Sequence, residues 1–260
     1  MSYFRWPYTV LFRGATTPAG ELSPWYLPIW IGISTLVVWL VVFVFGIGAG
    51  LVAWLRKPLE FFYNTPHRHI VLYLYLAIAP LTMVIALGSI VYDDWRHLYF
   101  IYPALVMLGL YGVTKLKNKG LSRIVLVLIF MQSGVAAYQL IKLHPFQIVY
   151  FNSLVSHDEE ALRHNYEMDY WGTGYKQALE YLIANAPEQE IKIVRGKPPL
   201  IFNVDILQVQ DRPRIKFVEE AEATYFVTNF RTHPEDYPYP NVVYEIKRQN
   251  STILRIYKLR

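Results

Sequence analysis

A short charged and aromatic segment lies between two long apolar runs of this chain, at residues 92–103, YDDWRHLYFIYP. It holds two consecutive acids, Asp93 and Asp94, followed by Arg96 and His97. Arginine and histidine can hold a phosphate while a neighbouring acid orients them, so the pattern is typical of a site for an anionic lipid headgroup, with Tyr99 beside it. The alternative is an ion-pair cluster that pins a turn, and the local sequence favours neither.

The apolar runs around this segment are long enough to cross a membrane. Four runs carry no charged side chain, and each approaches the ~17–25 residues that a membrane-spanning helix needs. They cover residues 29–55, 70–91, 98–114 and 124–141. Ionisable groups at a membrane boundary are costly and usually have a partner or a function. The sequence therefore predicts a four-helix transmembrane domain over residues 29–142, with the 92–103 segment at its edge.

Small residues and one proline add detail to the prediction of membrane helices. Glycines allow membrane helices to approach closely, which is the role expected for Gly46, Gly48, Gly50 and Gly88. Pro80 is expected to kink its helix without ending it, because neighbouring helices can satisfy the freed carbonyl.

Basic side chains predict which way the helices run. Arg56, Lys57 and Arg68 lie in the loop 56–69, and four more basic residues lie in the loop 115–123. Loops rich in lysine and arginine stay in the cytoplasm. Residues 1–28 are then an outer loop or interfacial segment, and both termini lie on the extracytoplasmic side.

Charge changes sharply after the fourth run. Residues 1–142 hold 11 basic and 4 acidic side chains, whereas residues 143–260 hold 14 and 16, which together give the net charge of +5. The positive charge thus belongs to inward-facing loops. The footprint of nucleic-acid binding, a basic stripe interleaved with exposed aromatics, is missing. The absence of cysteine excludes disulfides.

The last 118 residues predict a small extracytoplasmic α/β or α+β domain at 143–260. A helix is expected at 174–185, where apolar residues recur at three-and-four spacing, with Thr173 as its N-cap. Short strand-like runs follow it at residues 191–194, 215–218, 225–229, 242–247 and 253–259. The acidic run 158–160 reads as a solvated helix start.

The other histidines and hydroxyl groups do not form a recognisable metal or catalytic site. His67 and His69 form an i, i+2 pair without a neighbouring acid or cysteine, which is a poor metal site, so no metal is predicted. His144 follows the fourth run and is expected to be structural. No pattern supports a nucleophile, and no catalytic residue is assigned.

Several stretches resemble bacterial relatives of the protein O-mannosyltransferases, which belong to the GT-C superfamily of polytopic glycosyltransferases that use polyprenyl-phosphate sugars. The similar stretches are residues 23–31, 95–103, 144–147 with 150–152, and 169–172 with 175–176. They extend from about Trp6 to the end of the chain. Asp94 departs from this pattern, because relatives often have glycine there.

The resemblance implies a C-terminal half of such an enzyme in a bacterial inner membrane. Family members carry further helices before this region, and an acid in their first outer loop acts on the acceptor; nothing ahead of Trp6 supplies it. Two functions follow. The chain is half of a split glycosyltransferase, in which Arg96, His97 and Tyr99 hold the lipid phosphate and Asp93 and Asp94 orient them. Alternatively, it is a non-catalytic subunit of a larger membrane complex; a channel or transporter ranks below both.

The predicted membrane location and the resemblance indicate two kinds of binding partner. The lipid bilayer is one, and other membrane subunits or a missing N-terminal half are the second. No cofactor is expected, and a polyprenyl-phosphate-linked sugar would be a substrate if activity is retained.

Overall fold

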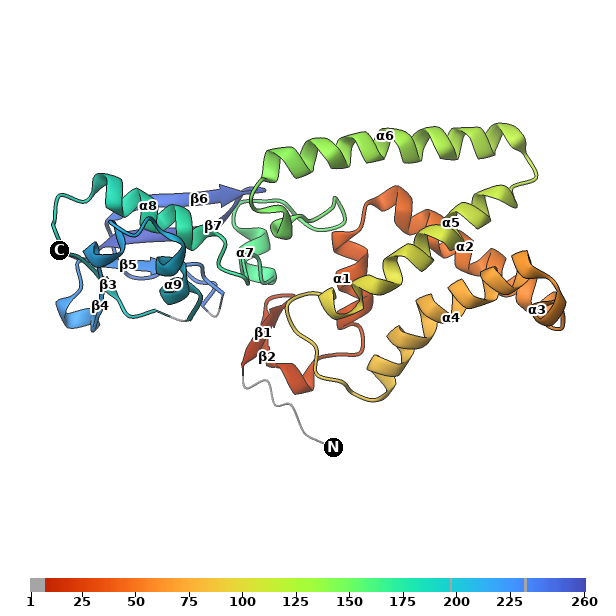
Figure 1. The fold of residues 1–260 in the computed structure, drawn as a ribbon, viewed down its shortest axis with the longest axis horizontal. Helices are drawn as coiled ribbons and strands as arrows, with labels where there is room; N and C mark the ends of the chain where they lie inside the picture. Colours follow the sequence, from red (N-terminus) through yellow and green to blue (C-terminus); the bar gives the residue numbers. More distant parts are fainter. Residues whose placement is uncertain (1–7, 197, 232) are drawn as a thin grey trace. The chain divides into compact units, whose positions relative to one another are not determined.

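The computed structural model describes residues 8–196, 198–231 and 233–260, and the chain forms two compact units (Figure 1). The helical unit contains residues 18–142 and 151–155 together with Tyr8. The sheet unit contains residues 9–17, 143–150 and 156–260. Each unit is therefore assembled from separated stretches of the chain.

The helical unit contains four helices long and apolar enough to cross a membrane by length and composition. In order they are α2 (Val37–Arg56), α4 (Thr65–Ala86), a 3₁₀ turn η2 (Arg96–Ile101) that continues into α5 (Tyr102–Thr114), and α6 (Lys119–Leu143). The shorter elements are η1 (Ala19–Glu21), α1 (Tyr26–Ser34) and α3 (Glu60–Tyr63). Helix α4 continues through Pro80.

The first apolar run differs from its prediction. Instead of one helix over residues 29–55, α1 ends at Ser34 and α2 begins at Val37, because Thr35 and Leu36 are extended. Helix α2 still has 20 residues, or about 30 Å at ~1.5 Å per residue, which is the thickness of a hydrocarbon core.

Two of the four glycines make the expected close contacts. A Cβ at Gly46 would lie 2.2 Å from the Leu108 carbonyl oxygen, and one at Gly50 would lie 3.2 Å from the Leu74 side chain. Helix α2 therefore packs against α5 and α4 through its glycine face (Figure 1). The prediction for the other two is wrong. A Cβ at Gly48 meets nothing within 4 Å, and Gly88 lies after α4 with a φ of 56°.

The sheet unit contains a five-stranded mixed sheet in the order β4-β3-β5-β7-β6. Strand β3 (Ile191–Val194) pairs in parallel with β4 (Ile215–Val218) and β5 (Tyr225–Thr228). Strand β7 (Ser251–Lys258) pairs antiparallel with β5 and β6 (Val242–Arg248). These strands begin within two residues of their predicted starts and end within one of their predicted ends. The prediction of a small mixed domain is confirmed.

Short helices join the strands of this unit. They are α7 (Ala161–Asn165), α8 (Gly174–Asn185) and α9 (Pro198–Phe202), with 3₁₀ turns at Gln147–Val149, Asn203–Ile206, Arg212–Arg214 and Glu220–Glu222. Helix α8 packs on β6 and β7 through fully buried residues that include Ala178 and Leu179.

Thr173 is the N-cap residue of α8, as predicted, but the capping hydrogen bonds come from another side chain. The Thr173 side chain makes no capping hydrogen bond. Instead, the Asp169 carboxylate accepts hydrogen bonds from the backbone N–H groups of Thr173 and Gly174, each at 2.8 Å. Asp169 is buried, and the cap satisfies donors that the first helical turn leaves unpaired.

The acidic run 158–160 is also more than a solvated helix start. Glu160 has a φ of 59° and accepts hydrogen bonds from the backbone N–H of Thr252 at 2.9 Å and from its hydroxyl at 2.6 Å. Its carboxylate also lies 2.9 Å from Nε of Arg163, a buried arginine that pairs with Asp236 at 2.8 Å. The acid therefore joins α7 to β7.

A hairpin from the start of the chain completes the sheet unit. Strands β1 (Thr9–Phe12) and β2 (Ala15–Pro18) are joined by Arg13 and Gly14, which both have positive φ. Phe12 forms a β-bridge with Tyr166, and the Gly14 N–H donates to the Asn165 carbonyl at 3.2 Å. Residues 9–17 are thus part of this unit although four long helices separate them from its remainder.

Candidate functional site

The turn that begins the 92–103 segment is tight and strained. Asp93 and Asp94 have φ values of 54° and 63°, in the left-handed region that glycine adopts without cost and aspartate adopts more readily than most residues. Both residues are buried, with 4% and 5% of their surface exposed. Two consecutive residues in this conformation aim both carboxylates into the protein.

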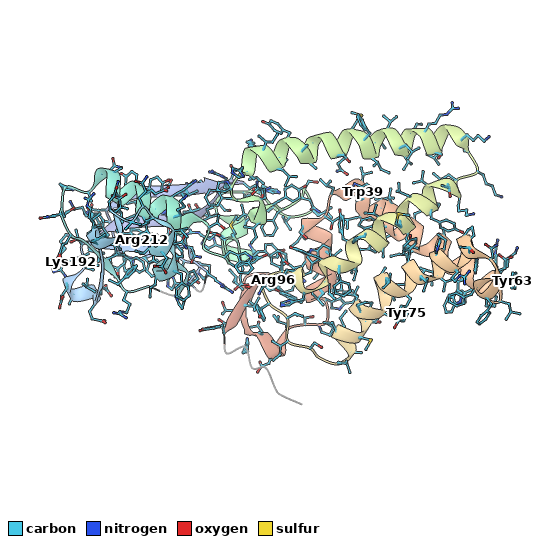
Figure 2. All side chains as sticks on the ribbon, in the orientation of Figure 1. Trp39, Tyr63, Tyr75, Arg96, Lys192 and Arg212 are labelled. Carbon is cyan, nitrogen blue, oxygen red and sulfur yellow. The ribbon has the colours of Figure 1, made fainter. Side chains whose placement is uncertain are left out.

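Each buried acid has its own partner. Asp93 forms an ion pair with Arg96, with Oδ2 and Nη2 2.9 Å apart, and the Arg96 guanidinium lies 5.0 Å from the centre of the Tyr92 ring. Asp94 accepts a hydrogen bond from the Tyr99 hydroxyl at 2.7 Å. The structure thus joins four of the five residues predicted for this site in two separate pairs, and Figure 2 labels Arg96 at the start of η2.

The side chains that solvent or a ligand can reach are the donors. His97 is exposed and packs edge-on against Tyr92, with ring centres 4.9 Å apart. Tyr99 is 48% exposed, and the Arg96 side chain is 23% exposed. A ligand at this surface would meet imidazole, phenol and guanidinium groups, whereas both carboxylates lie beneath them. The arrangement suits an anion better than it suits a general base for an acceptor.

A tryptophan attaches the segment to α1. The indole N–H of Trp95 donates to the Ser34 hydroxyl at 2.8 Å, and that hydroxyl donates to the Trp30 carbonyl at 2.6 Å. Trp95 is buried, and its ring lies 4.8 Å from that of Tyr99. The Trp95 side chain therefore connects Tyr99 to Ser34.

Asn152 attaches a third stretch of chain to the same helix. Its side-chain amide donates to the carbonyls of Gly32 at 2.6 Å and Thr35 at 2.5 Å, and its backbone N–H donates to Ile33 at 2.8 Å. These carbonyls are the unpaired acceptors at the end of α1. The similar stretches at 23–31, 95–103 and 150–152 thus meet around α1.

Sequence reasoning missed the supporting residues of this site. Ser34 and Asn152 are isolated polar residues, and nothing in their spacing indicates that they meet Trp95 and the end of α1. Ser34 lies within the apolar run 29–55, and Asn152 lies in the similar stretch 150–152, but neither position predicts these contacts.

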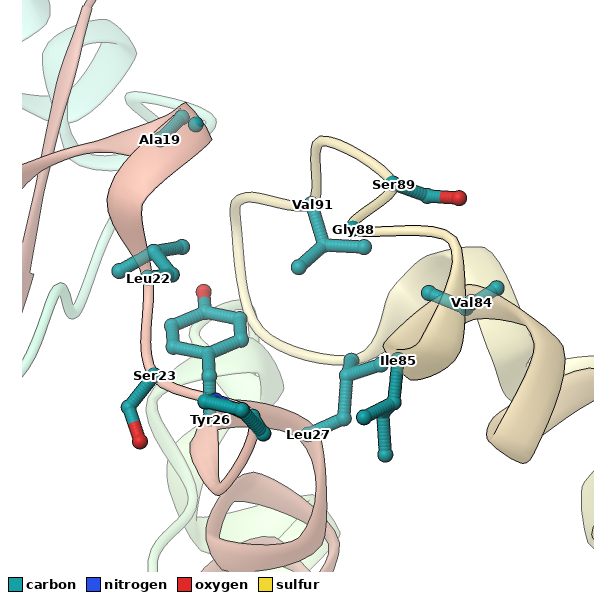
Figure 3. A pocket seen from close by; sticks show the side chains of 12 residues that line it. Ala19, Leu22, Ser23, Tyr26, Leu27, Val84, Ile85, Gly88, Ser89 and Val91 are labelled. Atoms are coloured by element: carbon teal, nitrogen blue, oxygen red, sulfur yellow. The ribbon is translucent and has the colours of Figure 1, made fainter.

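A small pocket lies beside the segment without including it. Its volume is about 120 Å³, and Tyr26 and Leu27 of α1 face Val84 and Ile85 of α4 across it (Figure 3). The remaining lining residues are Ala19, Gly20, Leu22, Ser23, Pro24, Gly88, Ser89 and Val91. The pocket is smaller than the ~300–1,000 Å³ of typical ligand sites and has no charged lining residue. It does not supply a binding site for a sugar phosphate.

The described residues offer no evident metal-binding site. Among the residues that the structure describes, no group of three or more His, Cys, Asp or Glu side chains could hold a metal ion. His67 instead lies 3.9 Å from a Glu60 carboxylate oxygen at the start of α4.

Comparison of the chain with protein families, with curated proteins and with solved structures finds no match in any of the three.

Proposed function

We propose that this chain is a membrane-embedded part of a GT-C-like glycosyltransferase that holds the phosphate of a lipid-linked sugar and does not itself supply the catalytic acid. The observation that carries the proposal is the division of roles in the 92–103 segment. Asp93 and Asp94 are buried against Arg96 and Tyr99, while His97, Tyr99 and part of Arg96 reach the surface. Such a surface offers hydrogen-bond donors to a phosphate.

The length of the helices supports a membrane location. Helices α2, α4, η2 with α5, and α6 have 19 to 25 residues each and few charges. The lysine- and arginine-rich loops after α2 and α5 would face the cytoplasm, which gives the 92–103 segment and both termini an extracytoplasmic location.

The composition of the sheet unit supports an even number of membrane crossings. Residues 9–17 precede the four long helices and residues 156–260 follow them, yet both belong to one compact unit. Segments that pair as Phe12 and Tyr166 do must lie on the same side of a bilayer. Four crossings satisfy this condition, whereas three or five would not.

Direct binding of the lipid phosphate tests the proposal. The probe is undecaprenyl phosphate added to the purified full chain in detergent, with undecaprenol as the uncharged comparison. The His97→Gln variant is expected to bind the phosphate at least about tenfold more weakly, since it removes the ring N–H donor, whereas the single Tyr99 O–H is already donated to Asp94. Equal binding of the phosphate and the alcohol would contradict the proposal.

Two further variants make the test specific. Arg96→Ala alone would leave the buried Asp93 without its ion pair, so it is combined with Asp93→Asn, which removes that buried charge. His69→Gln is the matched control, because His69 is an exposed histidine in α4, before the apolar run. Binding that falls as much in His69→Gln as in His97→Gln would show that the 92–103 segment is not the site.

A second candidate function is that of a structural subunit, and α6 favours it. Only 6% of its apolar window is buried, and Phe130 and Ile141 are 81% and 78% exposed. This face would contact either lipid or a neighbouring subunit. Purification in mild detergent separates the two functions: a partner with several spans and an acid in its first outer loop supports the split enzyme, whereas unrelated membrane subunits support the structural role.

A further inference from the structure

A second pocket lies in the sheet unit, at the carboxyl ends of two parallel strands. Its volume is about 310 Å³, within the range of small-molecule sites. Arg195 and Gly196, which follow β3, line one side, and residues 227–231, at the end of β5 and after it, line the other. Tyr175, Phe226 and Tyr237 complete the lining.

The strand order explains why a crevice forms there. The chain leaves β3 towards β4, which is its neighbour on one side, while the chain leaving β5 continues to β6 and β7 on the other side. Connections that diverge from adjacent parallel strands leave a gap above their carboxyl ends, and open α/β sheets use that gap to bind ligands.

The charge of this pocket is positive. Two arginines line it, and none of the described lining residues is acidic. Arg231 is already engaged: it donates to the Tyr170 carbonyl at 2.8 Å and lies 3.7 Å from the buried Glu167 carboxylate. Arg195 is exposed, and among the residues that the structure describes its guanidinium has no hydrogen bond or ion pair. One positive charge is therefore available to a ligand.

The remaining lining is largely aromatic. Tyr237 and Phe226 meet edge-on with ring centres 4.6 Å apart, and Tyr175 is buried. Aromatic faces pack well against the apolar face of a sugar or another ring, whereas Arg195 matches a phosphate or carboxylate.

We infer that this pocket binds a small organic oxyanion, a ring compound bearing a phosphate or carboxylate, with Arg195 as the residue that holds the anionic group. The ring lies against Tyr237 and Phe226. The site belongs to the sheet unit and does not depend on the lipid-phosphate function proposed for the 92–103 segment.

Calorimetric titration of the full chain in detergent tests this inference. Glucose 1-phosphate and glucuronate are the two anionic probes, glucose is the neutral ring, and inorganic phosphate is the anion without a ring. At least one anionic sugar is expected to bind, at least about tenfold more tightly than glucose and more tightly than inorganic phosphate. A preference between the two sugars identifies the anionic group. Failure of both to bind more tightly than glucose would overturn the inference.

Two substitutions locate the binding. Arg195→Gln is expected to weaken the binding of the anionic sugar at least about tenfold, since it removes a charge-assisted hydrogen bond. Lys216→Gln is the matched control, because Lys216 is an exposed cation on β4 that does not line the pocket. Unchanged affinity in Arg195→Gln, or equal weakening in Lys216→Gln, would overturn the assignment.

Discussion

The side-chain oxygen of Gln132, in the middle of α6, accepts a hydrogen bond from the backbone N–H of Val38 at 2.8 Å. Val38 lies in the first turn of α2, where N–H groups have no partner within the helix. The strongly polar side chains in the apolar part of α6 are Gln132, Ser133 and Gln139, and the first of them caps another helix.

Replacing this glutamine tests the cap. Gln132→Leu is expected to lower the free energy of unfolding by about 1–2 kcal/mol, because polar bonds between membrane helices contribute about that much and the Val38 N–H would lose its acceptor. Ser133→Ala is the control, since the Ser133 hydroxyl donates to the Ile129 carbonyl of its own helix. Unfolding in mixed micelles measures both. Equal losses in the two variants would contradict the role of Gln132.

Two glycines of α2 provide a matched pair. Gly46→Ala is expected to destabilise the protein by about 1–3 kcal/mol or more, since the new methyl group would overlap the backbone of α5. Gly48→Ala places its methyl group where nothing lies within 4 Å, and alanine favours helix, so this variant is expected to be neutral or slightly stabilising. Thermal unfolding of both variants compares them directly, and a similar loss in each would show that α2 and α5 do not pack through Gly46.

The left-handed turn predicts different effects for two small residues at one position. Asp94→Gly and Asp94→Ala both remove the hydrogen bond from Tyr99, but only alanine must adopt a φ near 63° against steric cost. Asp94→Ala is therefore expected to be less stable than Asp94→Gly by about 1 kcal/mol. Denaturant unfolding gives this difference without reference to the wild type, and an equal or reversed order would mean that the turn relaxes.

Stability of the sheet unit should depend on acid pH through Glu160. Burial raises the pKa of this carboxyl, but the hydrogen bonds from Thr252 and the charges of Arg163 and Lys247 outweigh burial, and the pKa lies below its usual 4.5. A lowered pKa contributes stability above the unfolded value, and this contribution is lost as the pH falls through the folded value.

We therefore expect the urea midpoint to fall as the pH drops below about 4.5, with a flatter profile in Glu160→Gln. That variant should also be less stable at pH 7 by about 1–3 kcal/mol, since it weakens bonds to a charged acceptor. Glu159→Gln is the control, because the neighbouring Glu159 side chain is 83% exposed. A Glu160→Gln profile as steep as that of the wild type would rule out this carboxyl as the source.

The sequence predicted local features well. Residues 174–185 form α8 as expected, because apolar spacing and the proline at 187 define a helix locally. The strands follow alternating runs between turn residues. Continuous apolar runs carry less information. Nothing within residues 29–55 indicates a break at Thr35, because Asn152, which donates to the Thr35 carbonyl, and Gln132, which accepts from the Val38 N–H, lie far along the chain.

The sequence singles out the residues of the candidate site but does not predict their geometry. The residues of the 92–103 segment stand out as charges between apolar runs. That Asp93 and Asp94 face inward follows from two positive φ values, which the residue types permit but do not require. The cap formed by Asp169 was likewise hidden, because Asp169 lies five residues before the first residue of the helix, whereas Thr173, directly before the helix, is at the usual position of a cap.

The hairpin at residues 9–17 affects both folding during synthesis and the behaviour of truncated fragments. Val10, Leu11 and Phe12 are buried, with at most 9% of each side chain exposed, and they belong to a unit whose remaining strands are synthesised last. During synthesis the 125 residues from 18 to 142, which include the four long helices, are translated before the next stretch of this unit. A soluble fragment beginning at residue 143 would lack it and would expose an apolar surface that the whole chain covers.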